Sequence, residues 1–230
     1  MTLKQKKFCG LLIGEMKMNK EHNIFVTMGA SNHTEEEREK NEFYATDPLF
    51  VNHLLEKEPW LKNKNLKVLE PSAGDGTLVD RFYELTGNKM DAYDLISRRE
   101  DIIEQDFFTK DFSNQYDVIL TNPPYLKDTI KTTTGLADYI LKALREVKTG
   151  GTVIMFLKTL HLESKVRYEK IFKNYPPSKL YVYADRISCY KNNDTSKPQG
   201  AISYSVFMWC NKKEDGTFDK DTKLDWIRYK

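Results

Sequence analysis

The segment Asp117–Tyr125, DVILTNPPY, places an amide, two prolines and a tyrosine directly after an apolar run. Proline lacks a backbone N–H and has a fixed φ, so Pro123 and Pro124 make this loop rigid. The side-chain oxygen of Asn122 and the carbonyl of Pro123 are then two acceptors with no competing donor nearby. Such a pair favours the binding of an NH2 group with its nitrogen lone pair directed outward. Tyr125 adds a flat surface for a planar amide or base, unless its ring packs in the core.

A second candidate site is the turn EPSAGDG at residues 70–76, which lies between an apolar run and a helical pattern. Its glycines permit a tight turn and the close approach of a ligand. The turn lacks both the Gly-Lys-Ser/Thr of a phosphate loop and the third glycine of a dinucleotide site. It therefore favours a ligand with a nucleoside end and an amino-acid end, the alternative being a plain strand–helix turn. Asp94 follows Gly76 by 18 residues, where nucleoside sites place an acid on the ribose hydroxyls.

A framework for these residues is indicated by apolar runs that alternate with helical patterns. Strands alternating with helices are typical of an α/β fold, with a parallel sheet covered on both faces. The last two predicted strands have no clear helix between them, so the sheet is expected to finish antiparallel. Strands are predicted at Leu66–Glu70, Met90–Asp94, Ile102–Ile103, Asp117–Thr121, Thr152–Leu157, Leu180–Tyr183 and Ile202–Trp209. Helices are predicted from Asp47 and over Leu78–Leu85, Leu136–Val147 and Glu163–Phe172.

Together these segments resemble the class I S-adenosylmethionine-dependent methyltransferases, and in particular the amino-methyltransferases of DNA that carry an NPPY motif and act on adenine N6. The resemblance runs from about Phe43 to Trp209. It implies a Rossmann-like fold with a mostly parallel seven-stranded sheet, an antiparallel last strand and helices on both faces. It implies that Asn122, Pro123, Pro124 and Tyr125 form the catalytic box. The residues implied to bind the cofactor, S-adenosylmethionine, are Tyr44, Thr46, Pro48, Glu70, Pro71, Ser72, Ala73, Gly74, Gly76, Asp94, Asp106, Phe107 and Asn122.

The activity implied by this resemblance is methyl transfer to the exocyclic amine of adenine in DNA, with the base flipped into the NPPY pocket. The same box is similar to that of RNA methyltransferases and of enzymes that methylate a protein glutamine, because it reads an NH2 group on an sp² carbon. A non-catalytic subunit of a modification complex is a further alternative. The segment Phe43–Pro48 before the first predicted strand favours the DNA group.

The charge distribution also bears on the substrate. Residues 1–125 hold 16 Lys and Arg against 22 Asp and Glu, whereas residues 126–230 hold 20 against 12. This asymmetry suggests that the second half faces a polyanion, although a scattered, solvated lysine surface explains it equally well. DNA is therefore the expected partner. The candidate nucleic-acid-binding residues are Lys127, Lys158, Lys165, Arg167, Lys191 and Lys197.

The expected organisation is a polar N-terminal arm at residues 1–40, interpreted as a loose segment or a frayed helix, and a single catalytic domain at 41–230. No stretch is long enough for a separate target-recognition domain. Base reading is therefore assigned to the loops Leu126–Thr134 and Ser188–Ala201, or to a separate recognition subunit.

Other functional classes find less support in the sequence. No apolar run approaches the ~20 residues that cross a bilayer, so we expect a cytoplasmic protein without a membrane partner. The three cysteines, Cys9, Cys189 and Cys210, have neither a disulfide pattern nor zinc spacing, so no metal is expected. His161 follows a predicted strand near the expected pocket rim and has no partner motif, so we interpret it as structural.

Overall fold

In the computed structural model, the described residues are 44–45, 47–125, 135–185, 190–191 and 202–228. All of them belong to one compact unit, Glu39–Lys230. Several predicted features lie outside the described residues: the arm at 1–40, the loop Leu126–Thr134 with Lys127, most of the loop Ser188–Ala201 with Lys197, and Thr46. The domain boundary expected near residue 41 stays a prediction.

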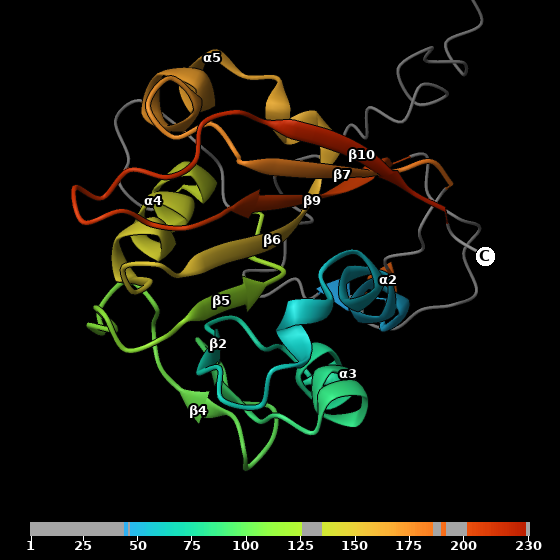
Figure 1. Ribbon diagram of the computed structural model, residues 1–230. Helices are drawn as coiled ribbons and strands as arrows, with labels where there is room; N and C mark the ends of the chain where they lie inside the picture. The colour runs from blue at the N-terminus through green and yellow to red at the C-terminus, as the bar shows by residue number, and fades with distance from the viewer. Residues whose placement is uncertain (1–43, 46, 126–134, 186–189, 192–201, 229–230) are drawn as a thin grey trace, which may run out of the picture. The chain divides into compact units, whose positions relative to one another are not determined.

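An eight-stranded sheet forms the centre of this unit, in the order β10-β7-β9-β6-β5-β2-β3-β4, which Figure 1 follows from top to bottom. Strand β9 runs antiparallel to both of its neighbours, and the other pairs are parallel. The strands are β2 (Val68–Glu70), β3 (Met90–Asp94), β4 (Ile103–Glu104), β5 (Val118–Thr121), β6 (Thr152–Lys158), β7 (Lys179–Tyr183), β9 (Tyr204–Trp209) and β10 (Lys223–Ile227). The predicted α/β fold class, mostly parallel with helices on both faces, is confirmed.

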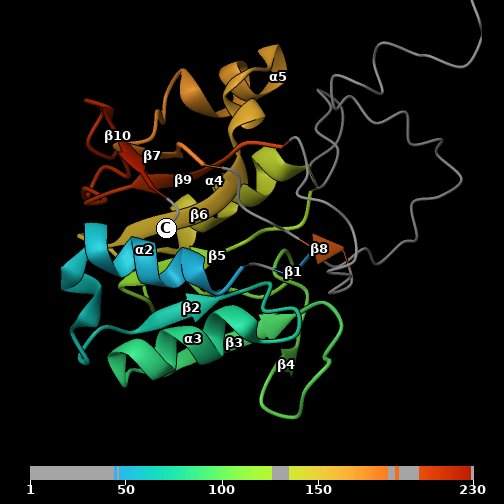
Figure 2. The ribbon, with the colours of Figure 1, turned by 90° about the vertical axis from the view of Figure 1, so that its right-hand side faces the viewer.

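The predicted strand count of seven is wrong, because β10 adds an eighth strand parallel to β7 at the edge of the sheet. The antiparallel strand is β9, as expected, but it is not the last strand of the chain. The sequence of β10, KLDWI, mixes charged and apolar residues, and four of its five residues are exposed, so no apolar run announced it. A separate two-stranded sheet pairs β1 (Tyr44–Ala45) with β8 (Tyr190–Lys191), visible in Figure 2.

The start of α2 and the end of α3 are each set by residues that favour a helix terminus. The Asp47 carboxylate accepts the N–H of Leu49 at 2.9 Å, and Pro48 precedes the first residue of α2 (Leu49–Lys57), as the sequence predicted. Helix α3 (Thr77–Thr86) ends at Gly87, whose φ of 67° favours glycine. The predicted helix Glu163–Phe172 is instead split into short turns. The remaining helical segments are η2 (Pro59–Lys62), α4 (Leu136–Glu146), η3 (Thr159–Leu162), α5 (Lys165–Arg167) and η4 (Tyr168–Phe172).

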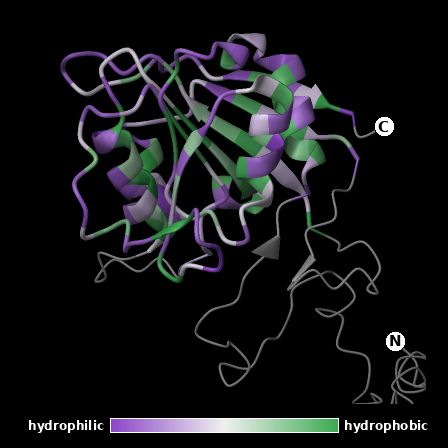
Figure 3. Cartoon of the chain, turned by 90° about the horizontal axis from the view of Figure 1, so that it is seen from below, coloured by the Kyte–Doolittle hydropathy of each residue, from purple (hydrophilic) through white to green (hydrophobic). Residues whose placement is uncertain are grey.

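Two apolar cores fill the space between the sheet and these helices. One core packs α4 against one face of the sheet, and the other packs α2 and α3 against the opposite face. Neighbouring strand residues divide between them, since Ile119 lies in the first core and Leu120 in the second. Figure 3 shows the hydrophobic strands running through the described region. Full burial of each large apolar side chain contributes about 1.5–3 kcal/mol, so the strand ends are held rigidly. Among the described residues, no helix is long and apolar enough to cross a membrane.

Candidate active site

The carboxyl ends of the parallel strands bring the predicted site residues to one edge of the sheet. Strand β2 ends at Glu70, β3 at Asp94 and β6 at Lys158, and Asn122 directly follows β5. Strands β3, β2, β5 and β6 are successive parallel neighbours. The sequence-predicted glycine turn and NPPY box therefore lie side by side, at the edge where open α/β sheets bind ligands.

The glycine turn is fixed to the end of β3 by two backbone donors. The N–H of Ala73 donates to the carbonyl of Tyr93 at 2.8 Å, and the N–H of Gly74 donates to Asp94 Oδ2 at 2.8 Å. Gly76 has a φ of 83°, and a Cβ there would lie 2.3 Å from Arg99 Nη1. The positive φ therefore favours glycine at this position, and a larger residue would also have to displace the Arg99 guanidinium.

Asp94 is partly committed to the protein itself. Its Oδ1 accepts the N–H of Ile96 at 3.0 Å, and Arg98 Nη1 lies 3.4 Å from the same oxygen. A carboxylate has about four lone-pair sites, so Asp94 retains capacity for a hydroxyl donor beside the turn.

At the end of β4, Asp106 is half-buried and its Oδ1 accepts the N–H of Phe108 at 2.8 Å. Phe107, the predicted aromatic, is only 4% exposed, and its ring centroid lies 4.7 Å from that of Tyr139. Phe108 is half-buried, with its ring 6.0 Å from Tyr139. Sequence reasoning passed over Phe108, although the Phe-Phe pair after Asp106 was the signal that either ring could face a ligand.

Two groups from β6 and η3 surround the tyrosine of the NPPY box. Lys158 Nζ lies 4.3 Å from the centroid of the Tyr125 ring, within cation–π distance. The His161 ring is stacked on Tyr125, with centroids 5.5 Å apart and planes at 18°. Arg167 donates to the carbonyls of His161 and Glu163, at 2.8 and 3.0 Å, and so holds η3 in place. The interpretation of His161 as merely structural did not anticipate this contact, which only tertiary structure reveals.

Glu70 joins the two halves of the site. Its side chain is buried, with 1% of the residue exposed, and its Oε1 accepts the N–H of Ser72 at 2.9 Å. Thr121, the last residue of β5, and Asn122, which follows it, lie beside this carboxyl. Burial raises the pKa of the Glu70 carboxyl to about 8, because it outweighs the lowering effect of the neighbouring donors, and the nearby charge of Asp94 acts in the same direction as burial.

Comparison with known proteins identifies this architecture. The family described as Methyltransferase small domain matches residues 85–179. A structure from Listeria monocytogenes assigned to the class I S-adenosylmethionine-dependent methyltransferases superposes with a TM-score of 0.56 and 15% identity, covering 80% of this chain and 64% of that chain. The methyltransferase subunit of a type I restriction-modification system from Streptococcus thermophilus gives a TM-score of 0.54 and 11% identity, covering 83% and 48%. The chain has the class I methyltransferase fold.

Among curated proteins, the chain is 29% identical to the Type II methyltransferase M.HincII of Haemophilus influenzae. That alignment covers 45% of this chain and 25% of the relative, so the chain corresponds to about a quarter of the curated relatives it matches. Methyltransferase families of this fold generally use S-adenosylmethionine.

The other predicted site residues sit at different distances from this carboxyl edge of the sheet. Strand β1 pairs Tyr44 with Lys191 of β8, so the backbone of a predicted cofactor segment lies beside a predicted DNA-binding residue. Pro48 is exposed at the start of α2. Lys165 is exposed on α5. Their predicted contacts with cofactor or DNA stay predictions.

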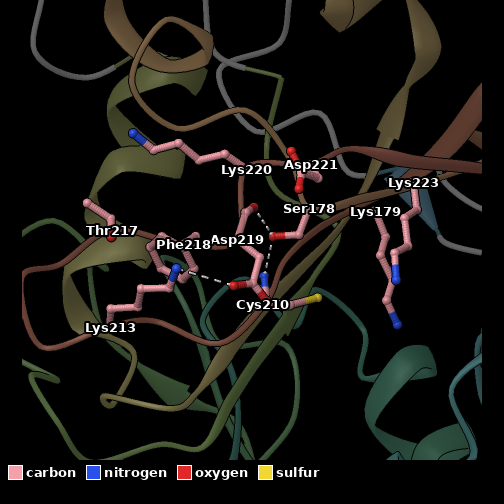
Figure 4. Close-up of a pocket in the computed structure, with 10 residues that line it drawn as sticks. All are labelled: Ser178, Lys179, Cys210, Lys213, Thr217, Phe218, Asp219, Lys220, Asp221 and Lys223. Atoms are coloured by element: carbon pink, nitrogen blue, oxygen red, sulfur yellow. Dashed lines mark hydrogen bonds and ion pairs between the residues drawn. The ribbon is translucent and has the colours of Figure 1, made fainter.

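A cavity of about 490 Å³ lies at the opposite edge of the sheet, where β7 begins and β9 ends. Figure 4 shows it lined by Lys179, Lys213, Lys220 and Lys223, with Asp219 paired to Lys213. It contains none of the predicted site residues and is therefore separate from the candidate active site. Within the described residues, no cluster of His, Cys, Asp and Glu side chains has an arrangement that could hold a metal ion.

Proposed function

We propose that the chain transfers a methyl group from S-adenosylmethionine to the exocyclic N6 amine of adenine in DNA. The observation that carries this proposal is the junction of the glycine turn and the NPPY box at the buried Glu70. A methyl donor held by the turn would then lie next to an amine held by Asn122. The similarity to Type II methyltransferases of Haemophilus influenzae supports DNA as the substrate.

The residues of the turn fit this cofactor. Gly74, with a φ of 60°, permits the tight turn beside Asp94, and the turn carries no lysine for a phosphate. Asp94 and Asp106 offer carboxylate oxygens to a ribose hydroxyl and an adenine amine, and Phe107 or Phe108 offers a ring face. When bound, S-adenosylmethionine supplies an activated methyl group on a sulfonium centre.

The NPPY box would orient the target amine. The amine of adenine is a poor nucleophile because its lone pair is delocalised into the ring. If Asn122 Oδ1 and the Pro123 carbonyl accept its two N–H groups, the nitrogen moves toward sp³ geometry and its lone pair points at the methyl carbon. This mechanism relies on orientation and charge stabilisation, and it needs no strong base.

A base in duplex DNA cannot reach this pocket, so it must flip out of the stack. Tyr125 would stack on the flipped base, and Lys158 and His161 lie against the same ring. Because the chain spans about a quarter of its curated relatives, we propose that a separate recognition subunit or segment contributes target sequence reading. Lys158 and Lys165 would contact phosphates, so affinity for DNA should fall steeply with salt.

The proposal is tested by offering tritiated S-adenosylmethionine with duplex DNA, single-stranded DNA, RNA and protein side by side. Label is expected on adenine N6 of DNA. Label on RNA or on protein glutamine would overturn the DNA assignment in favour of those classes, and cofactor binding without any transfer would favour a non-catalytic subunit.

Asn122→Ala is expected to lower methyl transfer by about 10²–10³-fold, as for other lost catalytic hydrogen-bond partners, while cofactor affinity is largely kept. Asn65→Ala, at an exposed position before β2, is the matched control and should leave turnover unchanged. Near-wild-type turnover of Asn122→Ala would contradict its catalytic role.

A further inference from the structure

Arg99, in the loop between β3 and β4, lies over the turn that would hold the cofactor. The position that a Cβ of Gly76 would occupy is 2.3 Å from Arg99 Nη1, so the guanidinium packs directly against the turn. The same Nη1 donates to the carbonyl of Asp75 at 3.1 Å. One side chain therefore contacts two consecutive residues of the turn, through their backbone.

All five N–H donors of the Arg99 guanidinium have acceptors. Nε and Nη2 donate to the two carboxylate oxygens of Asp101, at 2.9 and 2.6 Å. Nη1 and Nη2 donate to the two carboxylate oxygens of Asp80, in the first turn of α3, at 2.6 and 3.0 Å. The Asp75 carbonyl accepts the fifth N–H. A lysine, with three donors on a single nitrogen, cannot reproduce this arrangement.

The two carboxylates hold the guanidinium from different elements, because Asp80 belongs to α3 and Asp101 to the loop after β3. The Arg99 side chain is 30% exposed, and the Asp80 and Asp101 side chains are more exposed still. Exposed ion pairs contribute little to folding, since water solvates the separated charges well. The main consequence of these paired bonds is therefore geometric: they fix the position of the guanidinium over the turn.

A second link joins the turn to the same loop. The N–H of Gly74 donates to Asp94 Oδ2 at 2.8 Å, and Asp94 is the residue with which β3 ends. Within the loop, the Ser97 hydroxyl bonds to the carbonyl of Arg99 at 2.8 Å. The turn is thus held to one braced loop at two points, Gly74 and Asp75, and the predicted ribose-binding acid belongs to the first of them.

We infer that Arg99 is a positioning residue that holds the turn in the conformation that binds S-adenosylmethionine, acting through the backbone of Asp75 and Gly76. This inference rests on the proposed function, which assigns the cofactor to this turn. A turn that is ordered before binding has less conformational entropy to lose when the ligand binds. Without the guanidinium, that ordering occurs at the binding step, and affinity for the cofactor falls. Turnover of the loaded enzyme is kept, because the NPPY box follows a different strand, β5.

The test measures the affinity of the full chain for S-adenosylmethionine and S-adenosylhomocysteine by calorimetry. Arg99→Met should raise the Kd for both about 5- to 30-fold, which corresponds to ordering the backbone of about one residue on binding. Arg99→Lys keeps the charge but lacks the planar fork, so its Kd should lie closer to that of Arg99→Met than to that of the wild type. With saturating S-adenosylmethionine, kcat on DNA should stay within about 2-fold of the wild-type value.

Arg81→Met is the matched control. Arg81 lies on the same helix α3, its side chain is also 30% exposed, and it bonds to Glu84 and to Asn52 of α2, away from the turn. Its replacement removes a comparable ion pair and should leave the Kd for both nucleosides within about 2-fold of the wild-type value.

A double-mutant cycle with Asp80 separates positioning from general destabilisation. Asp80→Asn should raise the Kd about 2- to 5-fold in the wild-type background, because it loosens the guanidinium. In the Arg99→Met background the same change should have almost no effect, since Asp80 reaches the turn side by way of Arg99 alone. If Arg99→Met does not fold, as a melting curve would show, the cycle is run with Arg99→Lys.

Three results would overturn the inference and leave the proposed function standing: an unchanged Kd in Arg99→Met, an equal loss of affinity in Arg81→Met, or additive effects of the Asp80 and Arg99 substitutions. Failure of the wild-type chain to bind either nucleoside would overturn the proposed function, and this inference with it.

Discussion

The two ends of the sheet each bury a glutamate, and the two glutamates have opposite electrostatics. Glu58, after α2, is 2% exposed and hydrogen-bonds to Lys179, Tyr181 and Trp60. Burial alone would raise the pKa of Glu58, but these donors outweigh burial and lower it. Glu70 has only neutral donors, and its pKa is raised to about 8.

This difference indicates that Glu58 contributes to the stability of the fold, whereas Glu70 is available to interact with a ligand. At Glu58 the protein supplies its own cation, so the charge is already balanced in the folded chain. No cation faces Glu70 among the described residues, so a positively charged ligand bound nearby would stabilise its ionised carboxylate. A buried acid with only neutral partners is a functional candidate for that reason.

The contrast between Glu70 and Glu58 should have its largest effect on how the free energy of unfolding depends on pH. Because folding favours neutral Glu70, its contribution is fully present below the unfolded pKa of about 4.5 and is lost as pH rises through about 8. Relative to Glu70→Gln, the wild-type unfolding free energy should therefore fall between pH 5 and pH 8, by at most ~5 kcal/mol. Urea denaturation of both proteins at the two pH values measures this. A constant difference would show that Glu70 is ionised in the free protein.

Glu58→Ala should act on stability with the opposite pH dependence. It removes the partner of Lys179 and leaves the donors of Tyr181 and Trp60 unsatisfied, at a cost of about 3 kcal/mol near pH 7. The cost stays at the low end of buried pairs because the Lys179 side chain is 31% exposed and can turn to water. This loss should shrink as pH falls below about 4.5, where the carboxyl protonates in the unfolded chain.

Glu56→Ala, at an exposed position of α2 just before Glu58, is the control for Glu58→Ala and should change stability by less than about 0.5 kcal/mol. Nucleoside affinity should stay at the wild-type value in both variants. A loss of affinity in Glu58→Ala would break the separation between the two ends of the sheet.

The smallest expected effect concerns His161, whose segment η3 has no buried residue. His161→Ala should lower kcat/KM on DNA about 5- to 10-fold, because the ring supports Tyr125 where a base would stack. The melting temperature should change little. Leu162→Ala, in the same segment and 40% exposed, is the control and should leave both quantities unchanged. A large drop in melting temperature for His161→Ala would return His161 to a purely structural role.

The sequence was informative where function depends on contiguous residues. The DVILTNPPY segment and the EPSAGDG turn each contain their functional groups within a few positions. Each ends or follows a predicted strand of a parallel sheet, so both were expected at the same edge of that sheet. What remained hidden depends on contacts between distant segments. The stacking of His161 on Tyr125 joins residues 36 apart, and the burial of Glu70 depends on the packing of β5 beside β2. Strand β10 was missed because an exposed edge strand needs no apolar run.

Strand β10 is an edge strand, and its side chains disfavour pairing with a strand from another molecule. Its Lys223 N–H and Ile227 carbonyl face β7, so the N–H of Trp226 points away from the sheet. Asp225 Oδ1 accepts that N–H at 2.8 Å, while Asp225 Oδ2 holds Lys57 at 2.6 Å. An incoming strand would have to displace a charged side chain to pair there. On the outermost strand, where Leu224 and Trp226 are half exposed, this charged side chain at an outward N–H disfavours edge-to-edge pairing with a second strand.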